Sequence, residues 1–366
     1  SNKHNLLRVG PKKDGGYVID KRVINKCKTI VTCGLNDDWE FEKHYLKINS
    51  EKMLTELQER KKMSLLIVGT IAFDKIHANN HITGKILGGS ATYIGIASYH
   101  LGATPNIISV VGADFPNKYF EILKNHNFNL SGVEIIKNEK TFFWEGKYLS
   151  DMNQRETLKT ELNSLSKFNP KVPKQFCSPK IVMLGNLDPR VQLGVLDQLN
   201  TKPSFTITDT MNFWIENTPN KLKEVIKKTD LLIINDEETK QYSNNNSLIQ
   251  AGKYILTQGP KYLIIKKGEN GALIMSKNKK FFVPALPIEN VVDPTGAGDS
   301  FAGGLIGYLN KVNKFDFESL KKGMIYGSSI ASITVEGFGV ENISNMSNES
   351  LKTRINDFIN LIKIDF

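Results

Sequence analysis

The sequence predicts an α/β fold built on a doubly wound, mostly parallel central sheet with helices on both faces. From Ser64 onward, short apolar runs alternate with amphipathic stretches. Each apolar run has the length of a strand that is buried on both faces. The stretches between them carry apolar residues at helical spacing, as at Ile94, Ala97 and Leu101. Alternation of this kind is typical of parallel sheets whose crossover connections are helices.

Six apolar runs are predicted as strands of this sheet. They lie at residues 65–69, 107–111, 181–184, 205–208, 231–234 and 262–265. Helices are predicted between them, for example around Leu222, Val225 and Ile226. Because ligands bind outside the carboxyl ends of the strands in such sheets, polar residues that follow these runs are candidate site residues.

Two segments near 73–87 and 141–148 interrupt the alternation. The first is polar and rich in turn residues, and the second reads Thr-Phe-Phe-Trp-Glu-Gly-Lys-Tyr. Together they predict a small antiparallel flap, or lid, that stands off the central sheet. Aromatic side chains on such a flap would cover a ligand or meet a partner, and the alternative is a peripheral hairpin without a role.

Residues 1–62 are predicted to be an appendage to a main domain at 63–366. Met63 directly precedes the first strand, and the charged stretch 51–62 has the composition of a linker helix. About sixty residues can form only a marginal core of their own. The main domain is large for a single unit, although α/β folds reach this size.

The run Val-Asp-Pro-Thr-Gly-Ala-Gly-Asp-Ser at 292–300 carries the strongest signal for chemistry. Apolar residues at Phe301, Leu305 and Leu309 predict that a helix starts within it. A glycine-rich turn before a helix presents unpaired N–H groups that can cradle a phosphate. Asp299, whose ordinary pKa is about 4, would be ionised at neutral pH and could accept a proton. The alternative is a plain strand–turn–helix corner.

Composition excludes several other classes. The net charge is +10, but the lysines are dispersed, so a nucleic-acid partner is not expected. No apolar run is long enough to cross a membrane. Cys27, Cys33 and Cys177 lack the spacing of a zinc site, and a cytoplasmic location is predicted. Phosphate-binding loops of other nucleotide-binding classes are also missing.

Several motifs fall in a fixed order along the chain. Asp74 and Gly88-Gly89-Ser90 come first, followed by Asn235-x-x-Glu238, Lys266-Lys267-Gly268 and the run at 293–299. In this order the chain resembles the PfkB, or ribokinase-like, family of carbohydrate kinases over roughly residues 63–366. The resemblance implies ATP-dependent phosphorylation of a hydroxyl group on a sugar or sugar-like molecule, with Mg²⁺.

The resemblance also implies a role for each motif. Asp299 would be the catalytic base, with the anion hole at Gly296, Ala297 and Gly298. Substrate-binding residues would be Asp74, Gly88, Gly89, Ser90 and Asn186, with Asp188 not separable from Asn186. Nucleotide-binding residues would be Asn235, Glu238, Lys266 and Gly268, and Glu238 would also act indirectly on Mg²⁺. Two alternatives remain open, a turn role for Asp74 and a helix-capping role for Asn235 and Glu238.

The substrate is left open by departures from the family pattern. Tyr93 stands where the family usually has an asparagine that touches the sugar. With the aromatic flap residues Phe143, Trp144 and Tyr148, this makes a nucleoside an alternative to a plain sugar. A ligand sensor without turnover is a further alternative. The resemblance is also consistent with a homodimer formed through the flap.

A second resemblance concerns residues 5–45. Leu7-Arg8-Val9-Gly10-Pro11, Asp14-Gly15-Gly16-Tyr17 and the stretch 33–42 look like the opening of an FkbM-type methyltransferase domain. Only the beginning of such a domain is present, so no methyltransferase activity is predicted. The alternative is an unrelated leader.

Overall fold

The computed structural model describes residues 6–9, 17–20, 64–78, 80–149, 151–152 and 154–363, which fall in two units, 1–62 and 63–366. In the first unit, β1 (Leu6–Val9) pairs antiparallel with β2 (Tyr17–Asp20). The linker helix predicted at 51–62, and most of the stretch 5–45, lie outside the described residues. The second unit contains the elements from β3 to α13.

The central sheet has nine strands in the order β16-β15-β14-β13-β12-β11-β3-β7-β8. Their bounds are β3 (Leu65–Val68), β7 (Pro105–Gly112), β8 (Asn129–Ile136), β11 (Ile181–Leu184), β12 (Phe205–Asp209), β13 (Leu231–Asn235), β14 (Tyr262–Lys266), β15 (Ala272–Met275) and β16 (Lys280–Val283). The six predicted strands are β3, β7 and β11 to β14, and they form the parallel middle of the sheet. The predicted α/β fold is therefore confirmed.

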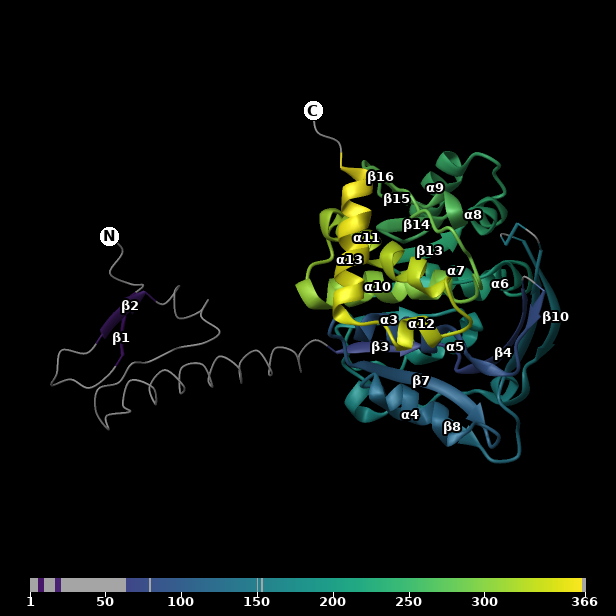
Figure 1. Ribbon diagram of the computed structural model, residues 1–366. Coiled ribbons are helices and arrows are strands. Elements are labelled where there is room, and N and C mark those ends of the chain that lie inside the picture. Colours follow the sequence, from purple (N-terminus) through teal and green to yellow (C-terminus); the bar gives the residue numbers. More distant parts are fainter. Residues whose placement is uncertain are drawn as a thin grey trace, which may run out of the picture. The chain divides into compact units, whose positions relative to one another are not determined.

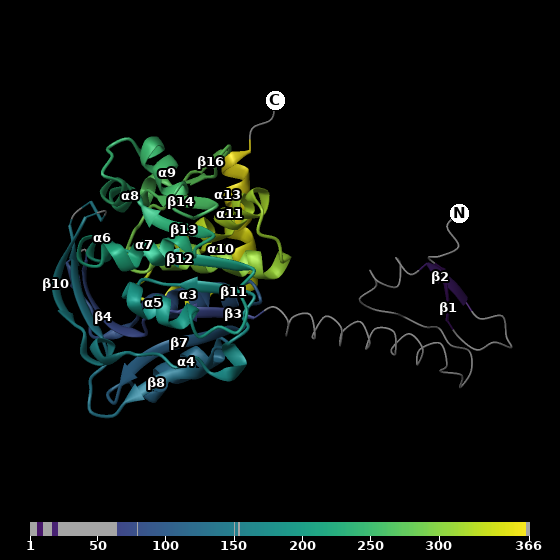
Figure 2. The same ribbon diagram turned by 180° about the vertical axis from the view of Figure 1, so that it is seen from behind.

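Helices cover both faces of this sheet (Figure 1). Their bounds are α3 (Ser90–Tyr99), α4 (Asn117–Asn125), α5 (Pro189–Leu196), α6 (Asn212–Asn217), α7 (Pro219–Lys227), α8 (Asp236–Ser243), α9 (Leu248–Leu256), α10 (Ala297–Val312), α11 (Phe317–Thr334), α12 (Glu341–Ser344) and α13 (Asn348–Ile362). Short 3₁₀ turns lie at Asn163–Lys167, Lys174–Phe176 and Gly268–Asn270. Helices α10, α11 and α13 lie toward the viewer in Figure 1, and α5 and α7 lie toward the viewer in Figure 2.

The core divides along the two faces of the strands. Leu65 and Ile67 point to the cluster that includes α3, α10 and α11, whereas Leu66 and Val68 point to the α5 side. This follows from the two-residue period of a strand, which requires both sets to be apolar in a doubly covered sheet. Helix α10 packs so closely on α3 that a Cβ at Gly303 would lie only 2.5 Å from the carbonyl oxygen of Ile94.

A second, five-stranded sheet stands at one end of this unit, where β4 and β10 appear in Figures 1 and 2. It contains β4 (Ala72–Ala78), β5 (His81–Ile82), β6 (Ile86–Gly88), β9 (Phe143–Tyr148) and β10 (Arg155–Glu161). We call it the lid sheet. The sequence predicted this flap as antiparallel, but β4 pairs parallel with β9, so the sheet is mixed. Strand β10 was not predicted.

None of the helices in the described part of residues 64–363 is both long and apolar enough to cross a bilayer.

Candidate active site

The turn before α10 is held in place by a buried carboxylate. We call residues 293–297 the anion turn. Asp293 accepts hydrogen bonds from the backbone N–H of Thr295 at 2.8 Å and of Gly339 at 3.1 Å. Gly296 is the N-cap of α10 and has a φ of 77°, a left-handed conformation that favours glycine. The turn therefore has one defined shape at the positive end of a 16-residue helix.

The sequence predicts an anion hole at the N–H groups of Gly296, Ala297 and Gly298, and the structure agrees with this only in part. The N–H of Ala297 donates to the carbonyl oxygen of Pro294 at 3.2 Å, so it is already used within the turn. Among the described residues, no acceptor is found for the N–H groups of Gly296, Gly298 and Asp299. Residues 296–299 are also partly exposed. The donors available to an anion are therefore those of Gly296, Gly298 and Asp299 rather than that of Ala297.

Lys266 brings a positive charge to this helix start from the end of β14. Its Nζ lies 3.0 Å from Oδ2 of Asp209, the last residue of β12. A Cβ at Gly298 would lie 3.1 Å from the same Nζ. Burial alone would lower the pKa of Lys266, but the carboxylates of Asp209, Glu238 and Asp299 outweigh it and raise that pKa. Lys266 is therefore a permanent cation beside the free amides.

Asp299 is partly exposed, so the helix start is not completely closed to solvent. Burial raises its pKa from 3.8 to about 7, and the negative charge of Asp209 adds to this effect. The positive charges of Lys266 and Arg155 oppose it. The ordinary value assumed from the sequence is therefore too low, and the carboxyl titrates near neutral pH, where a general base is most effective.

Asp74 is a buried carboxyl on β4 of the lid sheet. Gly88 packs so closely against this carboxyl that a Cβ at Gly88 would lie only 1.9 Å from Oδ2 of Asp74. Burial raises the pKa of Asp74 to about 7, and Asp293 and Asp299 add to the shift. The neighbouring Gly89, at a φ of 95°, passes so close to the backbone of Thr70 that a Cβ would clash. Asp74, Gly88 and Gly89 therefore lie together in the structure.

Asn235 and Glu238 form a complete capping box at the start of α8. Asn235 Oδ1 accepts from the N–H of Glu238 at 2.7 Å, and Glu238 Oε2 accepts from the N–H of Asn235 at 2.8 Å. The capping alternative thus describes their local geometry. Burial also raises the pKa of Glu238 to about 7, with Lys266 opposing the shift. The motif therefore caps a helix and places a buried carboxyl within the field of Lys266.

Three other predicted residues have structural roles in the fold: two use their side chains for hydrogen bonds, and the third lies in a turn. The hydroxyl of Ser90 lies 3.3 Å from that of Thr70 and accepts the N–H of Thr70 at 3.0 Å, so it ties α3 to the loop after β3. The side chain of Asn186 accepts from Trp214 Nε1 at 2.9 Å. Gly268, at a φ of 55°, begins a 3₁₀ turn.

Several residues at this site were missing from the predicted set. Asp209 directly follows the apolar run 205–208, and the rule that makes polar residues at strand ends candidate site residues covers it. Arg155, on the unpredicted β10, has its guanidinium 5.4 Å from the ring centre of Trp144, and its charge lowers the pKa values of Asp74, Glu238 and Asp299. No sequence motif marks Arg155, because only the folded lid sheet brings it to the carboxyls.

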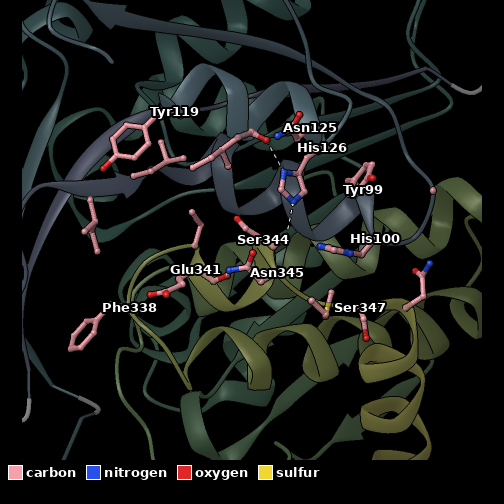
Figure 3. Close-up of a pocket in the computed structure, with 17 residues that line it drawn as sticks. Tyr99, His100, Tyr119, Asn125, His126, Phe338, Glu341, Ser344, Asn345 and Ser347 are labelled. Atoms are coloured by element: carbon pink, nitrogen blue, oxygen red, sulfur yellow. Dashed lines mark hydrogen bonds between the residues drawn. The ribbon is translucent and has the colours of Figure 1, made fainter. Parts of the chain in front are cut away.

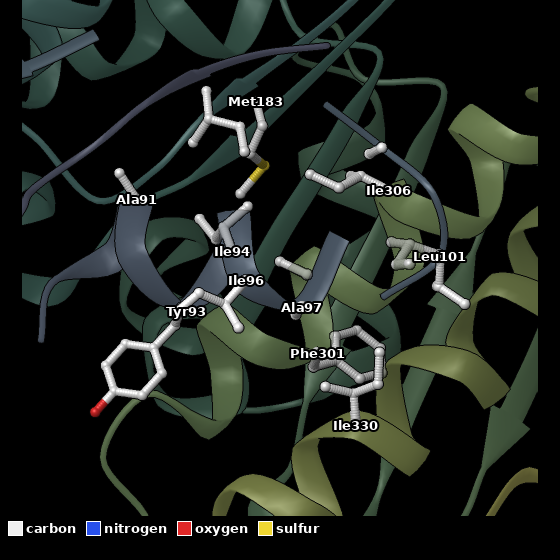
Figure 4. Packing of buried hydrophobic residues seen from close by; sticks show 14 of the residues in the cluster. Ala91, Tyr93, Ile94, Ile96, Ala97, Leu101, Met183, Phe301, Ile306 and Ile330 are labelled. Carbon is white, nitrogen blue, oxygen red and sulfur yellow. The ribbon is translucent and has the colours of Figure 1, made fainter. Parts of the chain in front are cut away.

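Tyr93 stands where the family usually has an asparagine that touches the sugar, but its side chain is not accessible to a ligand. It is 1% exposed, and a Cβ at Gly296 would lie 2.3 Å from its ring. Figure 4 shows its hydroxyl pointing away from the apolar cluster around Ile94 and Phe301. That hydroxyl is buried and has no hydrogen-bond partner among the described residues. The ring of Tyr93 thus packs against Gly296 and supports the anion turn.

A cavity of about 910 Å³ lies elsewhere, between α3, α4 and α12 (Figure 3). Both ring nitrogens of His126 lie within hydrogen-bond distance of backbone oxygens there, at 2.7 Å from Ile122 and 3.2 Å from Ser344. None of the site residues predicted from the sequence lines this cavity. It is therefore separate from the chemistry around Asp299.

Comparisons with known proteins give a consistent result. The model of the pfkB family of carbohydrate kinases matches residues 65–346. A cytidine kinase of Thermococcus kodakarensis is 26% identical over 252 residues, which are 67% of this chain and 88% of that enzyme. The crystal structure of the Methanocaldococcus jannaschii nucleoside kinase has a TM-score of 0.66 at 26% identity, covering 81% of this chain and 99% of that one.

A ribokinase II of E. coli, solved in complex with ATP and Mg²⁺, has a TM-score of 0.66 and covers 80% of this chain and 99% of that one. Its identity is 19%, so this likeness concerns the fold. Nothing in the comparisons supports the resemblance of residues 5–45 to FkbM-type methyltransferases.

Proposed function

The chain belongs to the pfkB family of carbohydrate kinases, and we propose that it transfers the γ-phosphoryl group of ATP to a hydroxyl group of a nucleoside. The family membership confirms the resemblance drawn from the motifs. One observation supports the chemistry above all others: Gly298, whose N–H is free, lies against the Lys266 ammonium, the free N–H of Gly296 belongs to the same helix start, and Asp299 follows directly. Donors, a cation and a base thus occupy one helix start.

In the proposed reaction the acceptor hydroxyl gives its proton to Asp299 as its oxygen bonds to the γ-phosphorus of ATP. The bond from that phosphorus to the bridging oxygen breaks, and ADP leaves with the electron pair. Charge on the moving phosphoryl group is met by the N–H groups of Gly296 and Gly298 and by Lys266. Because phosphoryl transfer passes through a loose transition state, positioning and charge neutralisation supply most of the rate.

The nucleotide would lie between α8 and α10, where the charges of Lys266 and Glu238 act on each other. Among the described residues, no group of three or more histidine, cysteine or acidic side chains is placed to hold a metal ion. Mg²⁺ keeps several waters and commonly binds through substrate phosphates, so a site with few protein ligands is compatible with Mg²⁺ carried by ATP. Glu238, with Oε2 held by the Asn235 N–H, would orient water near it. Bound Mg²⁺ would neutralise phosphate charge.

The acceptor would bind beside Asp74 on the lid sheet. In the register of that sheet, Asp74 on β4 is opposite Trp144 on β9, and Trp144 is partly buried. Trp144, Ile86 and Phe338 pack on the small cluster around Ile76 and Tyr148. A carboxyl that can bind sugar hydroxyls thus has aromatic surface beside it, and a flat base would use that surface. This supports a nucleoside over a free sugar.

A substrate panel tests the proposal. ATP consumption is measured with nucleosides, pentoses and hexoses, each with wild type and with Asp299→Asn. We expect turnover with at least one nucleoside and its loss in the variant. Turnover with free sugars alone would keep the kinase and change its substrate class. Tight binding of a panel member without ATP consumption would support the sensor alternative and contradict the proposal.

A further inference from the structure

One buried hydrogen bond connects the lid sheet to the anion turn. The hydroxyl of Tyr148, the last residue of β9, lies 3.0 Å from the hydroxyl of Thr295. Both residues are 8% exposed, and they are 147 positions apart in the chain. Thr295 directly precedes Gly296, whose N–H is one of the free donors. The bond therefore ends one residue away from the phosphate-binding groups.

The anion turn is held on three sides. Asp293 binds its backbone through the N–H of Thr295, and the ring of Tyr93 lies under Gly296. These two supports belong to the central fold, because Tyr93 lies on α3 and Asp293 is part of the turn itself. Tyr148 is the third support, and it comes from the lid sheet.

The partner strand brings a charge to the same place. Arg155 on β10 is the register partner of Tyr148 on β9, and its positive charge opposes the rise that burial causes in the pKa of Tyr148. The guanidinium lies 5.4 Å from the ring centre of Trp144, and its charge reaches Asp74 and Asp299. The end of the lid sheet that holds the turn therefore also carries a cation whose charge acts on both carboxyls.

We propose that the Tyr148–Thr295 hydrogen bond is a latch that couples lid position to the shape of the anion turn, so that Tyr148 is a positioning residue for phosphoryl transfer. The inference rests on the proposed function. Asp74, which would bind the acceptor, lies on β4 of the same sheet, and β4 pairs with β9. An acceptor that fixes the position of β4 thereby fixes β9. The Tyr148 hydroxyl then fixes the position of Thr295 and of the free N–H groups that follow it.

The latch predicts a change in kcat with little change in KM. Tyr148→Phe keeps the ring but removes the hydroxyl, and we expect kcat to fall about tenfold with KM for the acceptor within twofold. Thr295→Val is expected to behave alike. The double variant should be no worse than either single variant, because both remove the same bond. Thr295→Ser, which keeps a hydroxyl, should recover most of the rate.

A matched control lies within the lid sheet itself. Thr157 on β10 accepts a hydrogen bond from Trp144 Nε1 at 3.3 Å, and this bond does not involve the anion turn. Thr157→Val makes the same chemical change as Thr295→Val and should leave kcat within twofold of wild type. A comparable loss in Thr157→Val, a wild-type rate in Tyr148→Phe, or additive losses in the double variant would each overturn the latch.

A second measurement does not depend on turnover. Amide hydrogen exchange of residues 293–299 is followed in the full chain without ligand. Tyr148→Phe and Thr295→Val should speed exchange there at least threefold, whereas Thr157→Val should not. Unchanged exchange in both latch variants would contradict the latch. If wild type phosphorylates no panel member, the proposed function fails, and the exchange data still decide whether Tyr148 orders the turn.

Discussion

At Asp299, burial of the carboxyl makes it a better base and also lowers the stability of the fold at high pH. Burial raises the pKa of this carboxyl to about 7, and the negative charge of Asp209 adds to the shift. A base with this pKa takes up a proton readily near neutral pH, whereas an ordinary aspartate is far weaker. The folded state consequently binds a proton that the unfolded state releases. Below about pH 7 the residue is mostly protonated, and above it the fold must carry a buried charge.

Replacing Asp299 by asparagine should therefore separate activity from stability. The folded pKa is raised above 3.8, so stability is lost as pH rises from about 4 to about 7. Asparagine does not ionise and avoids that loss. We expect Asp299→Asn to melt several degrees above wild type at pH 8, with the difference shrinking toward pH 4. Turnover should fall at least about 100-fold. Thermal melts across pH and steady-state rates check this, and a near-wild-type rate would contradict it.

Arg155 should set the acidic limb of the pH profile. Its charge lowers the pKa values of Asp74 and Asp299, so Arg155→Gln should raise both. The fall of kcat/KM at low pH should then begin at higher pH, and the rate at pH 6 should drop more than the rate at pH 8. Lys159→Gln is the matched control, because Lys159 lies on the same strand and pairs with Glu161. A parallel shift in both variants would show a general charge effect.

The residues of the site were predictable to the extent that they sit in motifs or at strand ends. Asp299, Lys266 and Asp74 are such residues, and the structure brings their charges together. Arg155 and Tyr148 act through pairings made only by the folded chain, and no local pattern marks them. Ala297 shows the opposite case, because the motif suggested a free amide that a turn hydrogen bond already uses.

At the scale of single elements, burial on both faces decided which strands could be predicted. The middle strands of the central sheet are mostly buried and were predicted, and two of them, β3 and β11, contain only apolar residues. Strand β8 lies at the sheet edge with an irregular exposure, and every residue of β10 except the last is exposed. Such strands carry no hydrophobic signal. The parallel pairing of β4 with β9 likewise depends on the long connection between them.

The start of α10 should respond differently to two small substitutions. A Cβ at Gly298 would meet only the flexible end of Lys266, so Gly298→Ala should fold normally while displacing the ammonium. We expect about tenfold lower turnover at an unchanged melting temperature. Gly296→Ala should instead lose about 1–2 kcal/mol of unfolding free energy or more, because of its positive φ and the Tyr93 ring.

Gly194 supplies the control for this pair. A Cβ at Gly194, on α5, would lie in open space. Gly194→Ala should keep full activity and gain about 0.5–1 kcal/mol of unfolding free energy, because alanine favours a helix interior. Chemical denaturation and steady-state rates are measured for all three variants. Equal losses of stability in Gly296→Ala and Gly298→Ala would contradict the assignment of contacts at the helix start.

At the scale of the larger unit, the site exists only where two sheets meet. The central sheet supplies Lys266 and Asp209 at the ends of β14 and β12, and the helix after it supplies Asp299. The lid sheet supplies Asp74 and Arg155. The sequence therefore predicted Lys266, Asp299 and Asp74 as candidate site residues, whereas Asp209 and Arg155 join them only in the folded structure.

All of these groups lie between residues 64 and 363, which leads to a prediction about the whole chain. The family match spans residues 65–346, and residues 1–62 form a separate unit. A chain of residues 63–366 should therefore fold and keep kcat/KM within twofold of the full chain. Circular dichroism and thermal melts establish that the shortened chain is folded before its rates are compared. If it folds with the same melting temperature but turns over tenfold more slowly, then residues 1–62 contribute to catalysis, and the site described here is incomplete.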